Sequence, residues 1–122
     1  MKHRTKGRIL HRERSQRLSL LRGLTSDLLH YGTITTTLPK AKELRRYFEP
    51  LVTAARKGMN RHNRVMLSQS LRAPEDMERL HEVAKLHATR PGGYLRITRL
   101  PTKRQDDATM ARVDIMPGEV AK

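Results

Sequence analysis

The residues best suited to a chemical role are basic side chains gathered at the start of the chain. Up to residue 14 the only acid is Glu13, and Ile9 and Leu10 are the only large apolar side chains inside the run. The basic residues there are Lys2, Arg4, Lys6, Arg8, Arg12 and Arg14. A guanidinium can hold a phosphate through two parallel N–H bonds or stack on a base. Because this stretch has almost nothing to bury, we expect an arm that stays extended and disordered until it contacts phosphate.

The charge of the whole chain supports the same chemistry. Its 122 residues hold 26 lysines and arginines against 12 aspartates and glutamates, a formal net charge of +14. Solubilising tails and organelle transit peptides share this composition, but Gly7 and the spaced arginines would break an amphipathic transit helix. We therefore expect nucleic-acid binding. With one Phe, three Tyr and no Trp to stack on bases, recognition should use phosphate and shape.

Other chemistries find little support in the residues. Without cysteine there can be no disulfide, thiolate zinc site or cysteine nucleophile. His81 and His87 would fall on different faces of a helix, while His3 and His11 either contact RNA or are simply solvated. Neither the serines nor the glycine pair at 92–93 matches a catalytic or phosphate-loop motif. We expect no enzyme, cofactor, metal site or small-molecule substrate, and no apolar run spans a bilayer.

Two elements are expected to follow the arm. Leucines recur at three- and four-residue spacing from Leu18 to Leu28. They predict an amphipathic helix with Ser15 as its N-cap and Gly32 as its left-handed stop. The β-branched stretch 33–37 then favours a short strand.

The clearest helix follows. Pro39 fits its first position, Gly58 ends it, and Pro50 should kink it near residues 46–50 because proline removes a backbone hydrogen bond. Its buried face is predicted to be Ala41, Leu44, Phe48, Leu51, Val52 and Ala55, with lysines and arginines on the rest of the helix.

The remainder of the chain predicts two shorter helices and a hairpin. One helix spans about 61–71. The next begins at Pro74 with acids in its first turn, and its net negative charge should face it away from phosphate. Alternating apolar residues at 94–100 and 110–116 predict two antiparallel strands, whose connecting loop has a basic tip at Lys103 and Arg104.

These elements define an α+β fold in two layers. Helix, strand, three helices and two strands would form a small three-stranded sheet, mixed or antiparallel, covered by helices. The expected organisation is an arm at 1–14, one compact domain at 15–116 and a short tail at 117–122.

The most specific residue patterns resemble a known family. TTTLPKAKELRRYFEPL at 35–51, with MKHRTKGRIL at the start and RPGGYLRITRL at 90–100, is similar to the bacterial large-subunit ribosomal protein seventeen family over nearly the whole chain. The proline-started basic helix interrupted by Glu49-Pro50 carries most of the resemblance. Gln105 and Thr109 depart from the glycine and proline common in the family's final hairpin, which leaves the turn type open.

The resemblance implies a structural role in the large ribosomal subunit, on its solvent side near the exit of the peptide tunnel. Partners would be large-subunit rRNA and neighbouring ribosomal proteins, with no homo-oligomer, and the expected compartment is the cytoplasm, bound to ribosomes. Carried over by position, the residues facing RNA would be Lys2, His3, Arg4, Lys6, Arg8, Arg12, Arg17, Lys40, Lys42, Arg45, Arg46, Arg90 and Arg96.

A second reading is a DNA-binding protein of the nucleoid or regulatory type, because charge alone does not separate DNA from RNA. The sequence offers neither a dimerisation stripe nor a helix-turn-helix with a clean recognition helix, which favours the ribosomal interpretation.

Overall fold

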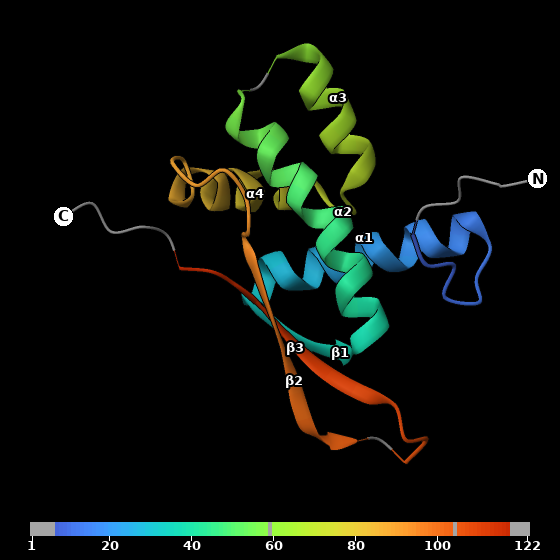
Figure 1. Cartoon of the computed structure of the whole chain (residues 1–122). Helices are drawn as coiled ribbons and strands as arrows, with labels where there is room; N and C mark the ends of the chain where they lie inside the picture. The colour runs from blue at the N-terminus through green and yellow to red at the C-terminus, as the bar shows by residue number, and fades with distance from the viewer. Residues whose placement is uncertain (1–6, 59, 104, 118–122) are drawn as a thin grey trace, which may run out of the picture.

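The computed structural model of the chain describes residues 7–58, 60–103 and 105–117. Four helices and three strands follow one another in the predicted order (Figure 1), which confirms the α+β class. Their bounds are α1 Arg14–Tyr31, β1 Thr33–Thr37, α2 Leu38–Arg56, α3 Arg61–Ser70, α4 Pro74–Leu86, β2 Leu95–Lys103 and β3 Thr109–Ile115.

The three strands form an antiparallel sheet in the order β1-β3-β2. In this register Val113 lies between Ile34 and Ile97 on the inner face, which α1 and α2 cover. One step along, Asp114 lies between Thr33 and Arg96 on the outer face. The alternation of apolar and polar residues in these strands thus separates a buried face from an exposed one.

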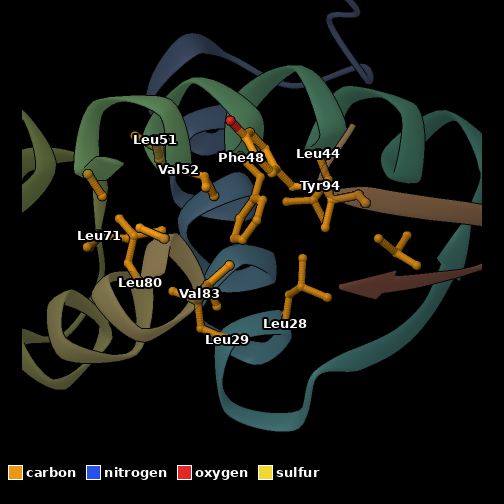
Figure 2. Close-up of a cluster of buried hydrophobic side chains, with 14 of the residues drawn as sticks. Leu28, Leu29, Leu44, Phe48, Leu51, Val52, Leu71, Leu80, Val83 and Tyr94 are labelled. Carbon is orange, nitrogen blue, oxygen red and sulfur yellow. The ribbon is translucent and has the colours of Figure 1, made fainter. Parts of the chain in front are cut away.

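The core lies where α2 crosses α1, α4 and the sheet (Figure 2). Every residue predicted for the inner face of α2 is buried, and Leu44, Phe48 and Val52 have no exposed surface. Tyr94, just before β2, packs among them and is also fully buried. The 3.6-residue spacing of α2 therefore identified the helix on which the rest of the domain packs.

The start of α1 differs from the prediction. The helix begins at Arg14 with Glu13 as its N-cap, and no side chain caps it, so the proposed Ser15 cap is wrong. The Arg17 N–H already donates to the Glu13 carbonyl at 2.8 Å, which includes Ser15 in the first turn. The other end is confirmed: Gly32 has a φ of 78°, and its N–H donates to the Leu28 carbonyl.

Pro50 lies inside α2, which continues beyond it to Arg56 as a single helix. Because proline has no N–H, the usual bond to the Arg46 carbonyl one turn earlier is missing. Strand β2 is longer than predicted: it runs past Arg99 to Lys103 through an irregularity in its pairing with β3. Arg104, at the predicted basic tip, lies outside the described residues.

Helix α4 begins at Pro74 as predicted, but one of its acids is not a surface charge. Asp76 is completely buried, and its carboxylate accepts the Ala73 N–H at 3.2 Å and lies 3.5 Å from an Arg79 guanidinium nitrogen. It therefore caps the helix from within the first turn. The other acids of this turn and its successors, Glu75, Glu78 and Glu82, are exposed.

Candidate nucleic-acid interface

The described part of the arm folds back over the beginning of α2. Leu10 and His11 both adopt left-handed backbone angles, with φ of 56° and 53°, and the Arg12 N–H donates to the Ile9 carbonyl. The resulting turn and the first residues of α2 line an open cleft of about 710 Å³. Arg8, Arg12 and Lys40 bring cationic side chains to its walls. Three residues predicted to face RNA thus line one cleft.

The helix end in this cleft is itself electropositive. Thr37 is the N-cap of α2 but its side chain makes no capping bond, and the first turn holds no acidic residue. The first-turn N–H groups of a helix have no intrahelical partners, and their dipoles favour an anion. A phosphate in the cleft would therefore meet backbone donors as well as Arg8, Arg12 and Lys40.

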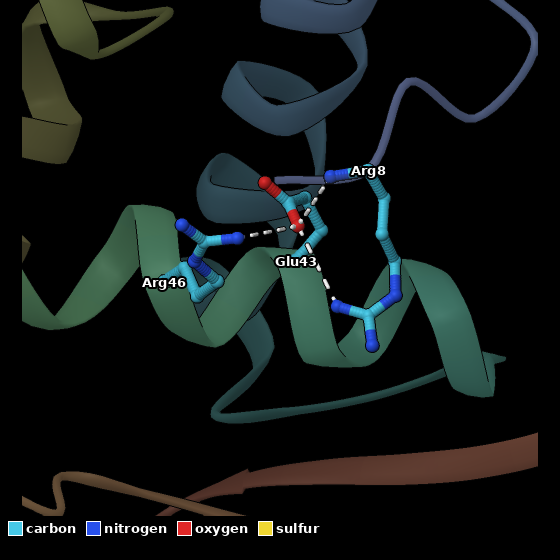
Figure 3. Close-up of polar contacts among 3 residues, drawn as sticks. All are labelled: Arg8, Glu43 and Arg46. Atoms are coloured by element: carbon cyan, nitrogen blue, oxygen red, sulfur yellow. Dashed lines mark hydrogen bonds and ion pairs between the residues drawn. The ribbon is translucent and has the colours of Figure 1, made fainter. Parts of the chain in front are cut away.

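Glu43 fixes the arm to α2 (Figure 3). Its Oε2 accepts the Arg8 backbone N–H at 3.2 Å and lies 3.7 Å from the Arg8 guanidinium and 3.8 Å from that of Arg46. The Glu43 side chain is only 13% exposed, whereas the Arg8 and Arg46 side chains are 43% and 49% exposed, so a shielded carboxylate holds two solvent-facing arginines. One carboxylate thereby connects the arm with the basic side of α2.

Gly7 makes this close approach feasible. Its φ is 91°, and a Cβ placed on it would lie 2.8 Å from Glu43 Oε1. Any other residue would both strain the backbone and push against the carboxylate.

The next basic residues of α2 surround a second hollow. Arg45 and Arg46 are exposed and, with Lys57, line a groove of about 740 Å³ between α2, α3 and the turn at 91–92. An Arg45 guanidinium nitrogen also donates to the Leu95 carbonyl at 3.4 Å, which ties α2 to β2. Lys42 is exposed on the same helix.

Of the other predicted residues that the structure describes, Arg17, Arg90 and Arg96 line neither of these two hollows. Arg17 is half-buried in the first turn of α1, and Arg96 is exposed on the outer sheet face. Arg90 donates to the Gly93 carbonyl at 3.3 Å, so part of its bonding capacity holds the glycine turn. Lys2, His3, Arg4 and Lys6 lie outside the described residues.

Sequence reasoning missed four residues of these surfaces. Glu43 and Gly7 shape the arm, Lys57 lines the groove, and Arg112 is exposed beside Asp114 on the outer sheet face. A carboxylate between the cations of KAKELRR was the only local signal for Glu43, since its partner Arg8 is 35 positions away. The alternation of residues along the strand could have placed Arg112 on the outer sheet face, where it lies opposite Thr35 and Thr98.

The described residues form neither a metal site nor a membrane-spanning helix. No three histidine or acidic side chains are arranged to hold a metal ion there. None of the helices in that part of the chain has the length and apolar character needed to cross a membrane.

The fold, the arm and the gathered cations define a small basic α+β protein, and comparison with known proteins places it among the ribosomal proteins. The family described as Ribosomal protein L17 matches residues 20–116. The large ribosomal subunit protein bL17 of Gemmatimonas aurantiaca is 42% identical over 117 residues, which cover 95% of this chain and 98% of that protein.

The chain belongs to the ribosomal protein L17 family. It is a structural constituent of the large ribosomal subunit and takes part in translation, and the family is not enzymatic. The resemblance noted in the sequence is confirmed.

Proposed function

We propose that this protein binds large-subunit rRNA through its arm and the basic side of α2. The observation that carries the proposal is the cleft in which Arg8, Arg12 and Lys40 surround the uncapped beginning of α2. Cationic side chains and backbone N–H donors meet in this cleft, a combination that suits a phosphate. The acidic residues of α4 lie on another helix, away from the described arm (Figure 1), and Glu43, the acid within this surface, is paired with Arg8 and Arg46.

Two effects would determine the affinity for rRNA: the release of counterions from the RNA and the ordering of the arm. Each phosphate neutralised by a lysine or arginine releases condensed counterions from the RNA, which makes the affinity strongly dependent on salt. Residues 7–12 already rest on α2 through Glu43, so less conformational entropy remains to be lost in this segment when RNA arrives. The proposed contacts include Lys2, His3, Arg4, Lys6, Arg8, Arg12, Arg17, Lys40, Lys42, Arg45, Arg46, Arg90 and Arg96.

We also propose where the protein lies in the large subunit. On the family resemblance, the protein would lie on the solvent side of the large subunit near the peptide exit, with other ribosomal proteins as neighbours, in the cytoplasm. The exposed acids of α4 would face away from rRNA, where they are available to a protein neighbour. Single-particle imaging of large subunits carrying the protein would test this position directly.

A matched pair of lysine variants tests the rRNA interface. Lys40→Gln removes a charge from the cleft, and Lys85→Gln removes one from α4, where Lys85 is exposed. In filter-binding titrations against a large-subunit rRNA fragment, Lys40→Gln should reduce the salt slope by about 0.7–0.9, the value for one lost phosphate contact. Lys85→Gln should leave the slope unchanged. Equal slopes for the two variants would contradict the proposed interface, and tighter binding to duplex DNA would favour the nucleoid reading.

A further inference from the structure

The groove beside Pro50 has features that phosphate binding alone does not use. Helices α2 and α3 form its sides, and the turn at 91–92 closes one end. Its lining combines the cations Arg45, Arg46 and Lys57 with flat or apolar surfaces from Pro50, Met66 and Pro91. Its volume of about 740 Å³ is within the usual range of ligand pockets.

Glu49 supplies an acceptor in this groove. Its Oε1 is buried and has no hydrogen-bond partner within the described residues. A buried polar atom without a partner is destabilising, and such an atom in a native structure calls for a physical reason. The final torsion of a glutamate side chain is broad, so the carboxyl group can turn an oxygen into the groove when a donor arrives.

We propose that this groove holds one unstacked guanine nucleotide of the rRNA, an inference that rests on the proposed rRNA binding. Guanine presents a ring N–H and an amino group side by side, and a carboxylate can accept both. Uracil offers a single N–H, and adenine offers an amino group without an adjacent ring N–H. The guanine edge therefore fits Glu49 best.

The other lining residues suit the remaining parts of a nucleotide. Arg45, Arg46 and Lys57 stand at the groove to receive the phosphate on either side of the base. The planar face of the base would rest on Pro50 and Pro91, and the Met66 thioether, 36% exposed, can contact its edge. Because three cations accompany a single acid, a polyanion is favoured over an apolar peptide, and the flat prolyl surfaces with the Glu49 acceptor favour RNA among polyanions.

Free nucleotides serve as probes, because they share a phosphate and differ in the base. The full chain would be titrated with GMP, inosine monophosphate and UMP while the backbone amide signals of Asn63 and Gly92 are followed by NMR. We expect GMP to bind at this groove about tenfold more tightly than UMP, the order of a bidentate base contact. Inosine monophosphate, which lacks the amino group, should behave more like UMP. This comparison needs no mutation.

Variants then assign the preference to Glu49. Glu49→Gln should abolish the discrimination between GMP and UMP, because the amide nitrogen opposes the guanine amino group. Glu78→Gln, which removes an exposed acid on α4, should leave it intact. A hairpin RNA with one unpaired guanine should bind more tightly than free GMP, because adjacent phosphates reach the groove cations; no gain would assign the groove to free nucleotides.

The outcomes separate this inference from the proposed function. Equal shifts at Asn63 and Gly92 with GMP and UMP, or a preference that persists in Glu49→Gln, would overturn the guanine site. Salt-sensitive shifts at Arg8 and Lys40 with every nucleotide would in that case leave the phosphate interface standing. Loss of the shifts at both places would contradict both proposals.

Discussion

The Arg8 backbone N–H donates to Glu43 Oε2 at 3.2 Å, so an acid inside the basic surface holds the arm in place. This relationship gives opposite expectations for the effect of Glu43 on RNA binding. As a negative charge it repels phosphate, but as an anchor it keeps Arg8 and its neighbours at the beginning of α2.

Removal of the carboxylate should therefore weaken specific rRNA binding, even though the net charge rises. We expect Glu43→Gln to reduce affinity for a large-subunit rRNA fragment about three- to tenfold, because the freed arm must lose more conformational entropy on binding. Affinity for unstructured RNA should stay the same or increase slightly. Filter binding at one fixed salt concentration measures both, with Glu78→Gln as the control. Tighter binding of Glu43→Gln to both RNAs would show that Glu43 acts only as a charge.

A glycine substitution tests the same anchor without changing charge. Gly7→Ala should weaken the contact between the arm and Glu43, since the new Cβ would lie 2.8 Å from Glu43 Oε1 and the carboxylate must move away. Gly58→Ala is a suitable control, because Gly58 also has a positive φ, 106°, with no atom within 4 Å of an added Cβ. Hydrogen exchange at the Arg8 amide should accelerate in Gly7→Ala alone.

The free energy of unfolding should change more in Gly58→Ala than in Gly7→Ala. Gly58 follows Lys57, the C-cap of α2, with a φ of 106°, so the alanine there should cost about 1 kcal/mol in the free energy of unfolding. Unchanged protection of the Arg8 amide in Gly7→Ala would mean that Glu43 does not hold the arm.

The features that could be predicted are those that depend on residues close together in the sequence. The inner face of α2 was predictable because spacing alone places Leu44, Phe48 and Val52 on one side of the helix. The Arg8–Glu43 contact was not, because nothing local relates residues 35 positions apart. Ser15 looked like an N-cap by residue type, but the turn at Leu10 and His11 sets where the chain enters α1. The cap position therefore depended on tertiary geometry.

Only part of the candidate site could be predicted from the sequence. The cations were visible from composition, and the cleft gathers Arg8, Arg12 and Lys40, whose contact with RNA stays a prediction. The groove needed α3 and the turn at 91–92 to come beside α2, which no periodicity within one element specifies. Asp76 was predicted only as an acid in the first turn of α4, and its burial and its bond to the Ala73 N–H show that it caps the helix.

Tyr94 links two arginines that hold the turn before β2. Its hydroxyl accepts from an Arg56 guanidinium nitrogen at 2.7 Å and donates to the Arg90 carbonyl at 3.1 Å. Tyr94→Phe keeps the buried ring but removes both bonds, so we expect the free energy of unfolding to fall by about 1–3 kcal/mol. Tyr31→Phe, at a residue 69% exposed, should change it little. Urea denaturation at constant m-value measures the difference, and equal midpoints would show that these bonds contribute nothing net.

Pro50 and Pro74 should respond to alanine with opposite signs. Pro50 lies in the interior of α2, where alanine restores the N–H that can donate to the Arg46 carbonyl and improves helix propensity, so Pro50→Ala should raise the free energy of unfolding by about 1–3 kcal/mol. Pro74 is at the first position of α4, where its missing N–H costs nothing and its fixed φ limits the unfolded chain, so Pro74→Ala should lower stability by about 0.5 kcal/mol. Thermal and urea unfolding of both variants measure these changes. If Pro50→Ala is the more destabilising of the two, α2 has adapted its packing to the proline, and the groove that Pro50 lines would be the feature that keeps it there.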